Sequence, residues 1–280
     1  SNTAISPWMR NICNTDKLDV LICTHNDADH ANGVIGLLEN WDGIVTEVWL
    51  PGSWTYRMKD LFLDPAGFYE ELWDKGRKAA GSGKGLEQLL LELKGERNEI
   101  SSKEEDIADP DSFDLMTLID TTDHFLHSQF YCHLIHPQFY CHHFHLHDPV
   151  CSLITEAINA ANNIVKIVHL ACGRGCVIRF FEFGEVVSGG RTGVLVPVNS
   201  GEMSTLKSKA IDALTYLALT TANKESLAFI SPEDEGTPAV LFTADSDLGF
   251  PLPSTAPRRG PIITTPHHGS EENANAYSAR

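Results

Sequence analysis

The most constraining feature of this chain is a short polar segment that concentrates metal-ligand side chains. Residues 24–33 read THNDADHANG, in which His25, Asp27, Asp29 and His30 lie within six positions. In an extended loop, alternate residues project to similar sides, so residues 25, 27 and 29 can face one site while His30 faces another. An ordinary polar turn does not need two histidines and two aspartates so close together. We therefore predict a metal-binding loop.

Further candidate ligands occur near the other end of the chain, and each group follows an apolar segment that has the pattern of a buried strand. Three apolar segments are each followed by, or end in, candidate ligands. Residues 18–23 (LDVLIC) precede the first loop, residues 239–245 (AVLFTAD) end in Asp245, and residues 261–265 (PIITT) precede His267 and His268. One short segment cannot surround two ions, so a two-metal site needs ligands from several strand ends. The pattern predicts that the three groups converge.

Strand and helix patterns alternate along the chain, which predicts an α/β fold. Strands are predicted at 18–23, 45–51, 165–170, 176–183, 193–198, 226–230, 239–245 and 261–265, the pair 226–230 and 239–245 as a hairpin. Helices are predicted at 33–40, over 65–109 as two helices joined by a turn, at 152–163 after Asp148-Pro149, and at 207–219. We expect one domain over residues 1–280, with a helical and His/Cys-rich insertion at about 60–150.

Two Cys- and His-containing segments leave alternatives open. Residues 124–147 hold eight of the thirteen histidines and repeat the sequence QFYCH, but they lack the paired CxxC spacing of a zinc ribbon. A duplicated loop or hairpin is favoured there over a specific metal site. In the segment CGRGC, residues 172–176, a tight turn formed by Gly173 and Gly175 is favoured over a redox or metal role.

Composition limits the partners of the chain. The 38 acidic residues exceed the 21 basic residues and give a net charge of -17, which disfavours a nucleic-acid partner and suits carboxylates gathered around metal. No apolar run approaches about 18 residues, and the first residues lack a signal-peptide pattern. Seven cysteines without framework spacing indicate reduced thiols. We expect a cytoplasmic protein without a membrane partner.

The first loop resembles the HxHxDH metal motif of the metallo-β-lactamase superfamily, in its HxDxDH variant. Together with FTADS at 242–246 and PHHGS at 266–270, it is similar to the hydrolase domain of DNA-internalisation competence proteins. The resemblance implies a four-layer αββα sandwich. That fold opens with strands before the first metal loop, whereas 24 residues precede His25 here. We therefore expect the first N-terminal strands to be missing or replaced by another segment.

The resemblance also implies a role for each candidate residue. His25 and Asp27 would bind a first metal, Asp29 and His30 a second, Asp245 would bridge the two, and His268 would complete the second site. Asp29 would also orient the attacking water, and His267 would contact the substrate or the transition state. The expected metal is zinc, as one or two ions, with manganese as a second candidate.

The family's usual third histidine for the first metal has no clear counterpart. The chain has no histidine between His169 and His267. Three alternatives stay open for this ligand. His169 is one candidate. The segment NKES at 223–226 resembles a stretch that replaces this histidine in the competence-type branch, and in the third alternative the first metal lacks this ligand.

The function that follows is metal-dependent hydrolysis by a metal-bound hydroxide. The resemblance favours a phosphodiester, and the negative charge of the chain favours a small substrate over a long polyanion. Two alternatives stay open: a non-catalytic metal-binding or interaction protein on the same fold, and a thioester or lactam hydrolase.

Overall fold

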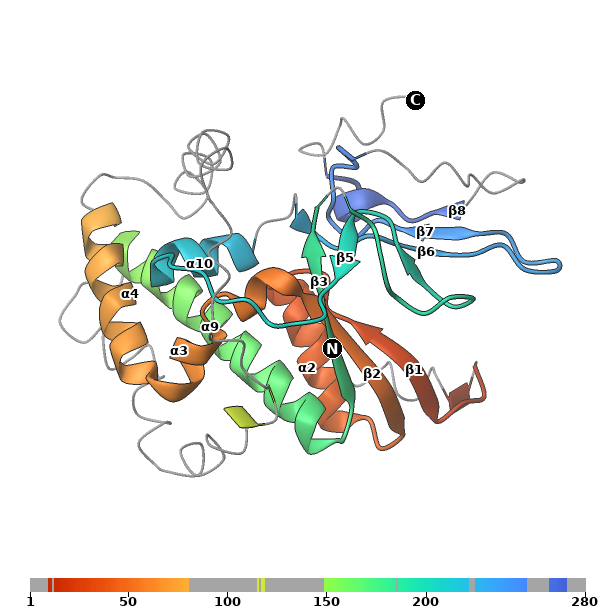
Figure 1. Ribbon diagram of the computed structural model, residues 1–280, viewed down its shortest axis with the longest axis horizontal. Helices are drawn as coiled ribbons and strands as arrows, with labels where there is room; N and C mark the ends of the chain where they lie inside the picture. Colours follow the sequence, from red (N-terminus) through yellow and green to blue (C-terminus); the bar gives the residue numbers. More distant parts are fainter. Residues whose placement is uncertain are drawn as a thin grey trace.

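The computed structural model describes residues 10–11, 13–80, 115, 117–118, 149–184, 186–221, 225–250 and 262–270. They form a mixed α/β structure with two mixed β-sheets and helices to one side of them (Figure 1). The first sheet has the order β1-β2-β3-β5. Its strands are β1 (Lys17–Ile22), β2 (Ile44–Pro51), β3 (Val177–Phe183) and β5 (Ser200–Glu202). The α/β class expected from the sequence is confirmed.

In the first sheet, β1, β2 and β3 are parallel and β5 runs antiparallel to β3. Parallel strands with apolar runs need cover on both faces, and β2 is buried along most of its length. Because β1 is the edge strand among the described strands, the loop that follows it lies at the margin of the sheet. This position leaves the loop accessible to groups from the second sheet.

The second sheet has the order β4-β6-β7-β8. Its strands are β4 (Val196–Pro197), β6 (Phe229–Ser231), β7 (Val240–Phe242) and β8 (Ile262–Ile263). β6 and β7 form the predicted antiparallel hairpin, and β8 lies parallel to β7. The parallel pairing brings the residues that follow β7 and β8 to the same end of this sheet.

The two sheets share an apolar core. Trp49 of β2 and Phe181 of β3 are fully buried with Phe229 of β6. The ring centroid of Trp49 lies 5.0 Å from that of Phe181 and 5.3 Å from that of Phe229. Both ring pairs are tilted, and such aromatic contacts add to the stabilisation that burial provides. The sheets therefore pack against each other, as adjacent β-layers.

Helices cover the opposite face of the first sheet, where the largest apolar core lies. They are α2 (Ala28–Asn40), α3 (Met58–Leu63), α4 (Pro65–Ala80), α9 (Pro149–Gly173) and α10 (Ala213–Thr220), with the short 3-10 helix η2 (Gly52–Thr55). α9 packs along α2 and α4, and all of these helices lie on one side in Figure 1. In the described part of the chain, no helix has the length and apolar content that crossing a membrane requires.

The prediction of a strand at residues 165–170 is wrong, because helix α9 continues through these residues. Ile164, Ile167, Val168 and Ala171 are buried. Their spacing of three and four residues is that of one helix face. The run VKIVHL is rich in β-branched residues and has the composition of a strand, but packing against α2 and α4 overrides this weak local preference.

Other predicted elements shifted or fell outside the described residues. The helix predicted at 207–219 begins at Ala213, because Asp212 accepts hydrogen bonds from the backbone N–H groups of Leu214 and Thr215 and caps the helix there. The strand predicted at 193–198 is reduced to the two residues of β4. The insertion predicted at about 60–150 contains α4, whereas the His/Cys-rich segment 124–147 lies outside the described residues.

Two phenylalanines of β3 test the contribution of the core between the sheets. Phe181 is fully buried, and Phe183, two residues along the same strand, is 41% exposed. Phe181→Ala should lower the free energy of unfolding by about 3–5 kcal/mol, since it removes a ring from a packed core. Phe183→Ala should lower it by about 1 kcal/mol or less. Urea denaturation followed by tryptophan fluorescence measures both, and equal losses would contradict the packing described here.

Candidate metal centre

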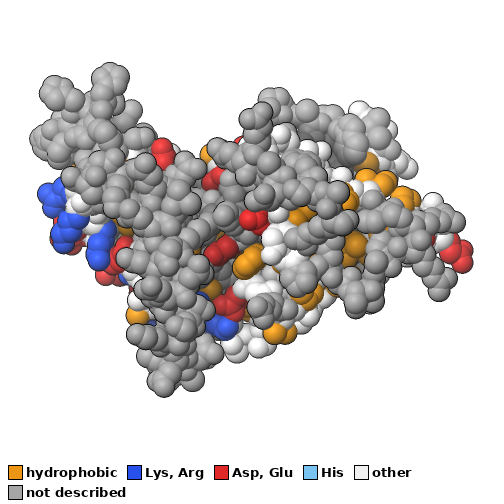
Figure 2. All heavy atoms as spheres, turned by 90° about the horizontal axis from the view of Figure 1, so that it is seen from above, with side chains coloured by type: hydrophobic (Ala, Val, Ile, Leu, Met, Phe, Trp, Pro, Cys, Tyr) orange, Lys and Arg blue, Asp and Glu red, His pale blue; other side chains and the backbone are white. Residues whose placement is uncertain are grey.

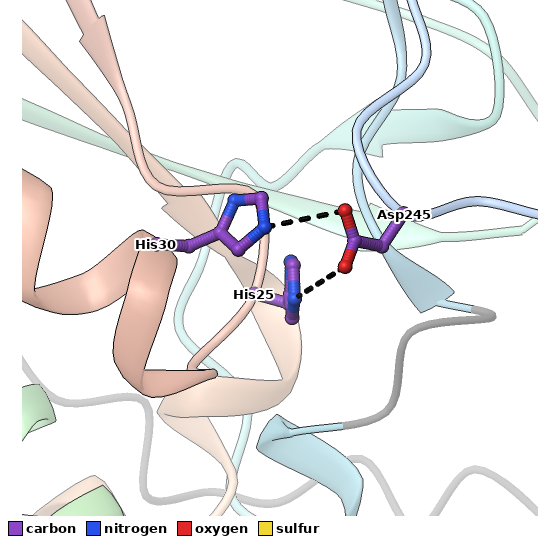
Figure 3. Close-up of side chains that lie close together, drawn as sticks. All are labelled: His25, His30 and Asp245. Atoms are coloured by element: carbon purple, nitrogen blue, oxygen red, sulfur yellow. Dashed lines mark ion pairs between the residues drawn. The ribbon is translucent and has the colours of Figure 1, made fainter. Parts of the chain in front are cut away.

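Three side chains from distant parts of the chain point toward one another (Figure 3). His25 lies in the loop after β1, His30 in the first turn of α2, and Asp245 three residues beyond the end of β7. Nε2 of His30 lies 3.2 Å from Oδ1 of Asp245, and Nε2 of His25 lies 3.6 Å from Oδ2 of the same carboxylate. The two imidazole centroids are 4.1 Å apart. The predicted convergence of the first loop with Asp245 is therefore present.

These separations fit a group of metal ligands. One ligand atom from each of the three residues lies within 4.8 Å of the other two. Ligand atoms about 2.0–2.1 Å from a tetrahedral zinc ion are about 3.3 Å from one another. The contact of 3.6 Å between His25 and Asp245 is too long for a hydrogen bond but close to that ligand spacing. The group could hold a metal ion.

Contacts at Nδ1, the second ring nitrogen, hold the His25 ring in place. Its side chain is 2% exposed, and Nδ1 lies 3.0 Å from Oγ1 of Thr24 and 3.2 Å from Oγ of Ser226. Nε2 makes no hydrogen bond within the described part of the chain although it is buried. A hydroxyl that accepts a hydrogen bond from the Nδ1–H group leaves the lone pair of Nε2 available, as in many metal sites. A bound cation would satisfy this nitrogen.

Ser226 belongs to the segment 223–226 that the sequence singled out as a replacement for the missing histidine. The structure places its hydroxyl against His25, while residues 223–224 lie outside the described residues. The other candidate, His169, has a different environment: it belongs to α9, and its ring stacks on Phe62 with the centroids 5.5 Å apart. His169 does not belong to the group formed by His25, His30 and Asp245.

Asn26 anchors the loop that follows β1 to the helices. Its side-chain amide donates to the carbonyl of Ala160 in α9 at 2.8 Å and to Oγ1 of Thr220 in α10 at 3.2 Å. Its backbone N–H donates to the carbonyl of Thr220 at 2.9 Å. Sequence reasoning missed this residue. The available signal was a polar, non-ligating side chain between two ligands of the loop, and Asn26 is 2% exposed.

The second half of the motif is helical, because α2 begins at Ala28 and not at residue 33 as predicted. Asp27 stands at the N-cap with extended backbone, and Asp29 lies in the first turn, where a carboxylate interacts favourably with the helix dipole. Oδ2 of Asp27 lies 3.7 Å from Nε2 of His25, and Oδ2 of Asp29 lies 3.8 Å from Nε2 of His30. Each aspartate thus accompanies a different histidine, at the more exposed side of the group.

Hydrogen bonds join the segment that follows β7 to the segment that follows β8, next to Asp245 in the sequence. Oγ1 of Thr243 lies 3.0 Å from Oγ1 of Thr264, and the backbone N–H of His267 donates to the carbonyl of Ala244 at 3.0 Å. Ala244 and His267 have φ values of 46° and 44°, in the left-handed region that residues other than glycine rarely adopt. Strained backbone of this kind concentrates at functional sites.

His267 lies near the group, with Nε2 3.7 Å from Oδ2 of Asp245. The carboxylate oxygens of Asp245 therefore face different partners: Oδ2 faces His25 and His267, and Oδ1 faces His30. The side chain of His268, the other histidine predicted to bind metal, lies outside the described side chains.

The cysteines near these elements are buried to different extents. Burial raises the pKa of the Cys23 thiol to about 12, and its Sγ donates to the carbonyl of His25. Burial also raises the pKa of Cys176, whose thiol donates to the carbonyl of Val45. Gly175 has a φ of 70° in the turn before β3, in line with the tight turn predicted for this segment. Protonated buried thiols are poor nucleophiles and poor metal ligands.

A pocket of about 360 Å³ adjoins the metal-ligand group and includes His30 in its wall. It lies between the edge strand β1 and the second sheet. The described residues that line it are Val20, Ile22, Thr24, His30, Leu195, Leu227, Phe229, Phe242, Ala244 and Thr264. The candidate centre is thus open on one side to a space of the size that small ligands occupy.

Comparisons of the chain with protein-family models, with curated proteins and with solved structures found no match. The functional interpretation therefore rests on the geometry of the group.

The anchoring role of Asn26 can be tested against a second asparagine that also donates to a helix carbonyl. Asn40 is exposed and donates to the carbonyl of Gly36 at 2.8 Å. Asn26→Ala should lower the free energy of unfolding by about 1–3 kcal/mol, because it leaves buried acceptors without their donor. Asn40→Ala should change it by about 0.5 kcal/mol or less. Urea denaturation measures the difference, and a tolerated Asn26→Ala substitution would contradict the anchoring role.

Proposed function

We propose that this chain is a metal-dependent hydrolase whose ion binds between His25, His30 and Asp245. The observation that supports this most strongly is the arrangement of two imidazoles and one carboxylate around a common point, with the buried Nε2 of His25 making no hydrogen bond in the described part of the chain. Neutral imidazole with carboxylate is a donor set that suits zinc, and manganese is the second candidate.

The number of ligands favours catalysis over a structural role. Structural zinc sites are closed by four protein ligands, whereas catalytic sites have three and keep one position open. Among the residues that the structure describes, the group has three members, and it lies beside the pocket that contains His30. A divalent cation bound there would supply Lewis acidity, polarising the substrate and lowering the pKa of water.

The chain's own residues have separate tasks in this proposal. The carboxylate of Asp29 is 62% exposed beside His30, where it can accept a hydrogen bond from an attacking water and orient it. His267 is placed to contact the substrate from the other side of Asp245. In the hydrolysis, the oxygen of water forms a bond to phosphorus or to a carbonyl carbon, the ester bond breaks, and the leaving oxygen takes a proton.

The two oxygens of Asp245 also allow a second ion. His25 and Asp27 lie on the Oδ2 side, and His30 and Asp29 accompany Oδ1. This division is the one implied by the resemblance to the HxDxDH motif, with Asp245 as the bridging residue. We propose one zinc ion as the minimum and two as the full complement, with His268 as a further ligand of the second.

The proposed fold and substrate follow from the same features. Helices on one face of a sheet, with a second sheet on its other face, account for three layers of a four-layer metallo-β-lactamase sandwich, and the ligands lie at strand ends as that fold requires. We propose a small phosphodiester or related ester as the substrate. A net charge of -17 disfavours a long polyanion.

Metal binding is tested first with Asp245→Asn, which removes the charge and keeps the shape. Zinc affinity, measured by competition with a chromogenic chelator, should fall more than about 100-fold, since changes around a ligand alone cost about 10–100-fold. His169→Gln is the control and should leave the affinity unchanged within about twofold. A loss of zinc affinity in His169→Gln, with none in Asp245→Asn, would place the metal elsewhere.

Hydrolysis is tested on a panel of a phosphodiester, a carboxylic ester, a thioester and a chromogenic lactam, with zinc and then with manganese. Asp29→Asn should lower kcat on the best substrate by about 100-fold or more, as expected for a group that positions the attacking water. Asp74→Asn, on the exposed side of α4, is the matched control. Full activity without metal would contradict the proposal, and tight zinc binding without any turnover would indicate a non-catalytic module.

A further inference from the structure

The pocket beside His30 has an apolar body. Seven of its ten described lining residues are apolar: Val20, Ile22, Leu195, Leu227, Phe229, Phe242 and Ala244. Val20 and Ile22 are alternate residues of β1, and both contact the core shared by the two sheets. The pocket is therefore a continuation of that core to the molecular surface, where the edge strand β1 leaves the second sheet open.

The polar residues of the pocket lie next to the metal-ligand group. They are Thr24, which precedes His25, His30 itself, and Thr264, which bonds to Thr243. The pocket thus has a polar end at the proposed metal and an apolar body that extends along β1 and β7. An occupant that fits both ends has a polar reacting group and an apolar substituent.

The charge of the pocket contrasts with that of the chain. None of its described lining residues is Asp, Glu, Lys or Arg, although the chain has 38 acidic residues and 21 basic ones. A groove that binds a nucleic-acid backbone needs cations along its length. This pocket lacks them in its described wall, so an alkyl or aryl group fits it better than a second phosphate.

The mouth of the pocket adjoins an exposed apolar surface. Phe242, which lines the pocket, is 42% exposed, and Ile262 of β8, which pairs with Val240 on the same face of the sheet as Phe242, is 54% exposed. Figure 2 shows hydrophobic side chains at the end of the molecule where Figure 1 places β6, β7 and β8, whereas Lys and Arg side chains gather at the opposite end, near α4. An apolar group can therefore approach the pocket along the second sheet.

We infer that the substrate carries an alkyl or aryl group that this pocket buries, so that the natural substrate is a small amphiphilic ester of phosphoric acid and not a polynucleotide. The inference rests on the proposed function, because it places the ester group at the metal end. The pocket then selects the substrate by its apolar substituent, and the metal-ligand group holds the anionic part.

The experiment measures binding of alkylphosphonates to the zinc-loaded chain by calorimetry. The series runs from methyl- to propyl- to hexylphosphonate, which share one headgroup and differ only in apolar length. Burial of each methylene should raise the affinity about fourfold until the pocket is full. The same order should hold for inhibition of bis(p-nitrophenyl) phosphate hydrolysis, which gives an independent readout.

A matched pair of variants locates the effect. Phe242→Ser, in the wall of the pocket, should flatten the dependence of the affinity on alkyl chain length. Phe183→Ser removes a phenylalanine of similar exposure (41%) that does not line the pocket, and it should retain the wild-type series. Circular dichroism checks that both variants fold. If one of them does not, the affinities of the wild-type chain for the three phosphonates decide whether the inference holds.

The outcomes separate the two proposals. Equal affinity for all three phosphonates, in a chain that binds zinc and hydrolyses the phosphodiester, overturns the inference and leaves the proposed function intact. Faster hydrolysis of single-stranded DNA than of hexyl p-nitrophenyl phosphate also overturns it. Failure to bind zinc, or to hydrolyse any ester, overturns the proposed function and this inference with it.

Discussion

The structure of the candidate site depends on one electrostatic constraint, the burial of the Asp245 carboxylate. This residue is 3% exposed at the end of the second sheet, and a buried carboxylate is stable only with charged or hydrogen-bonding partners. The imidazoles of His25 and His30 meet it from the loop and the helix that follow β1. The contact therefore joins the margins of two sheets. A divalent cation bound between these side chains would balance the charge of the carboxylate.

Two kinds of interaction hold this contact in place. The apolar core of Trp49, Phe181 and Phe229 brings the sheets together, but hydrophobic burial has little directional preference. Direction comes from hydrogen bonds: Asn26 fixes the loop to α9 and α10, and Ser226 and Thr24 fix the plane of the His25 ring. Because these groups are buried, each unmade bond carries the cost of desolvation. The site is thus positioned by polar contacts on a framework that the apolar core supplies.

The same framework explains why the candidate metal centre and an apolar pocket are neighbours. β1 is the edge of the first sheet among the described strands, so part of the apolar surface between the sheets stays open along Val20 and Ile22. The metal-ligand loop begins where β1 ends. A ligand held at His30 therefore lies beside apolar side chains that an inner strand would have covered. The site thus joins polar side chains at one end with apolar side chains at the other, as small-ligand sites commonly do.

The sequence by itself determined the α/β class, β1, β2, β3, the hairpin of β6 and β7, and the candidate ligands His25, His30 and Asp245, because these depend on local periodicity and on side-chain chemistry. It did not determine α9 beyond residue 163, since VKIVHL suits a strand or a buried helix equally until its packing partners are known. Only the tertiary structure decided that Ser226 contacts a ring 201 positions away, that Asn26 reaches Ala160 across 134, and that His169 stacks on Phe62 away from the site. Such contacts depend on how the sheets and helices pack against one another, which the local spacing of side chains does not specify.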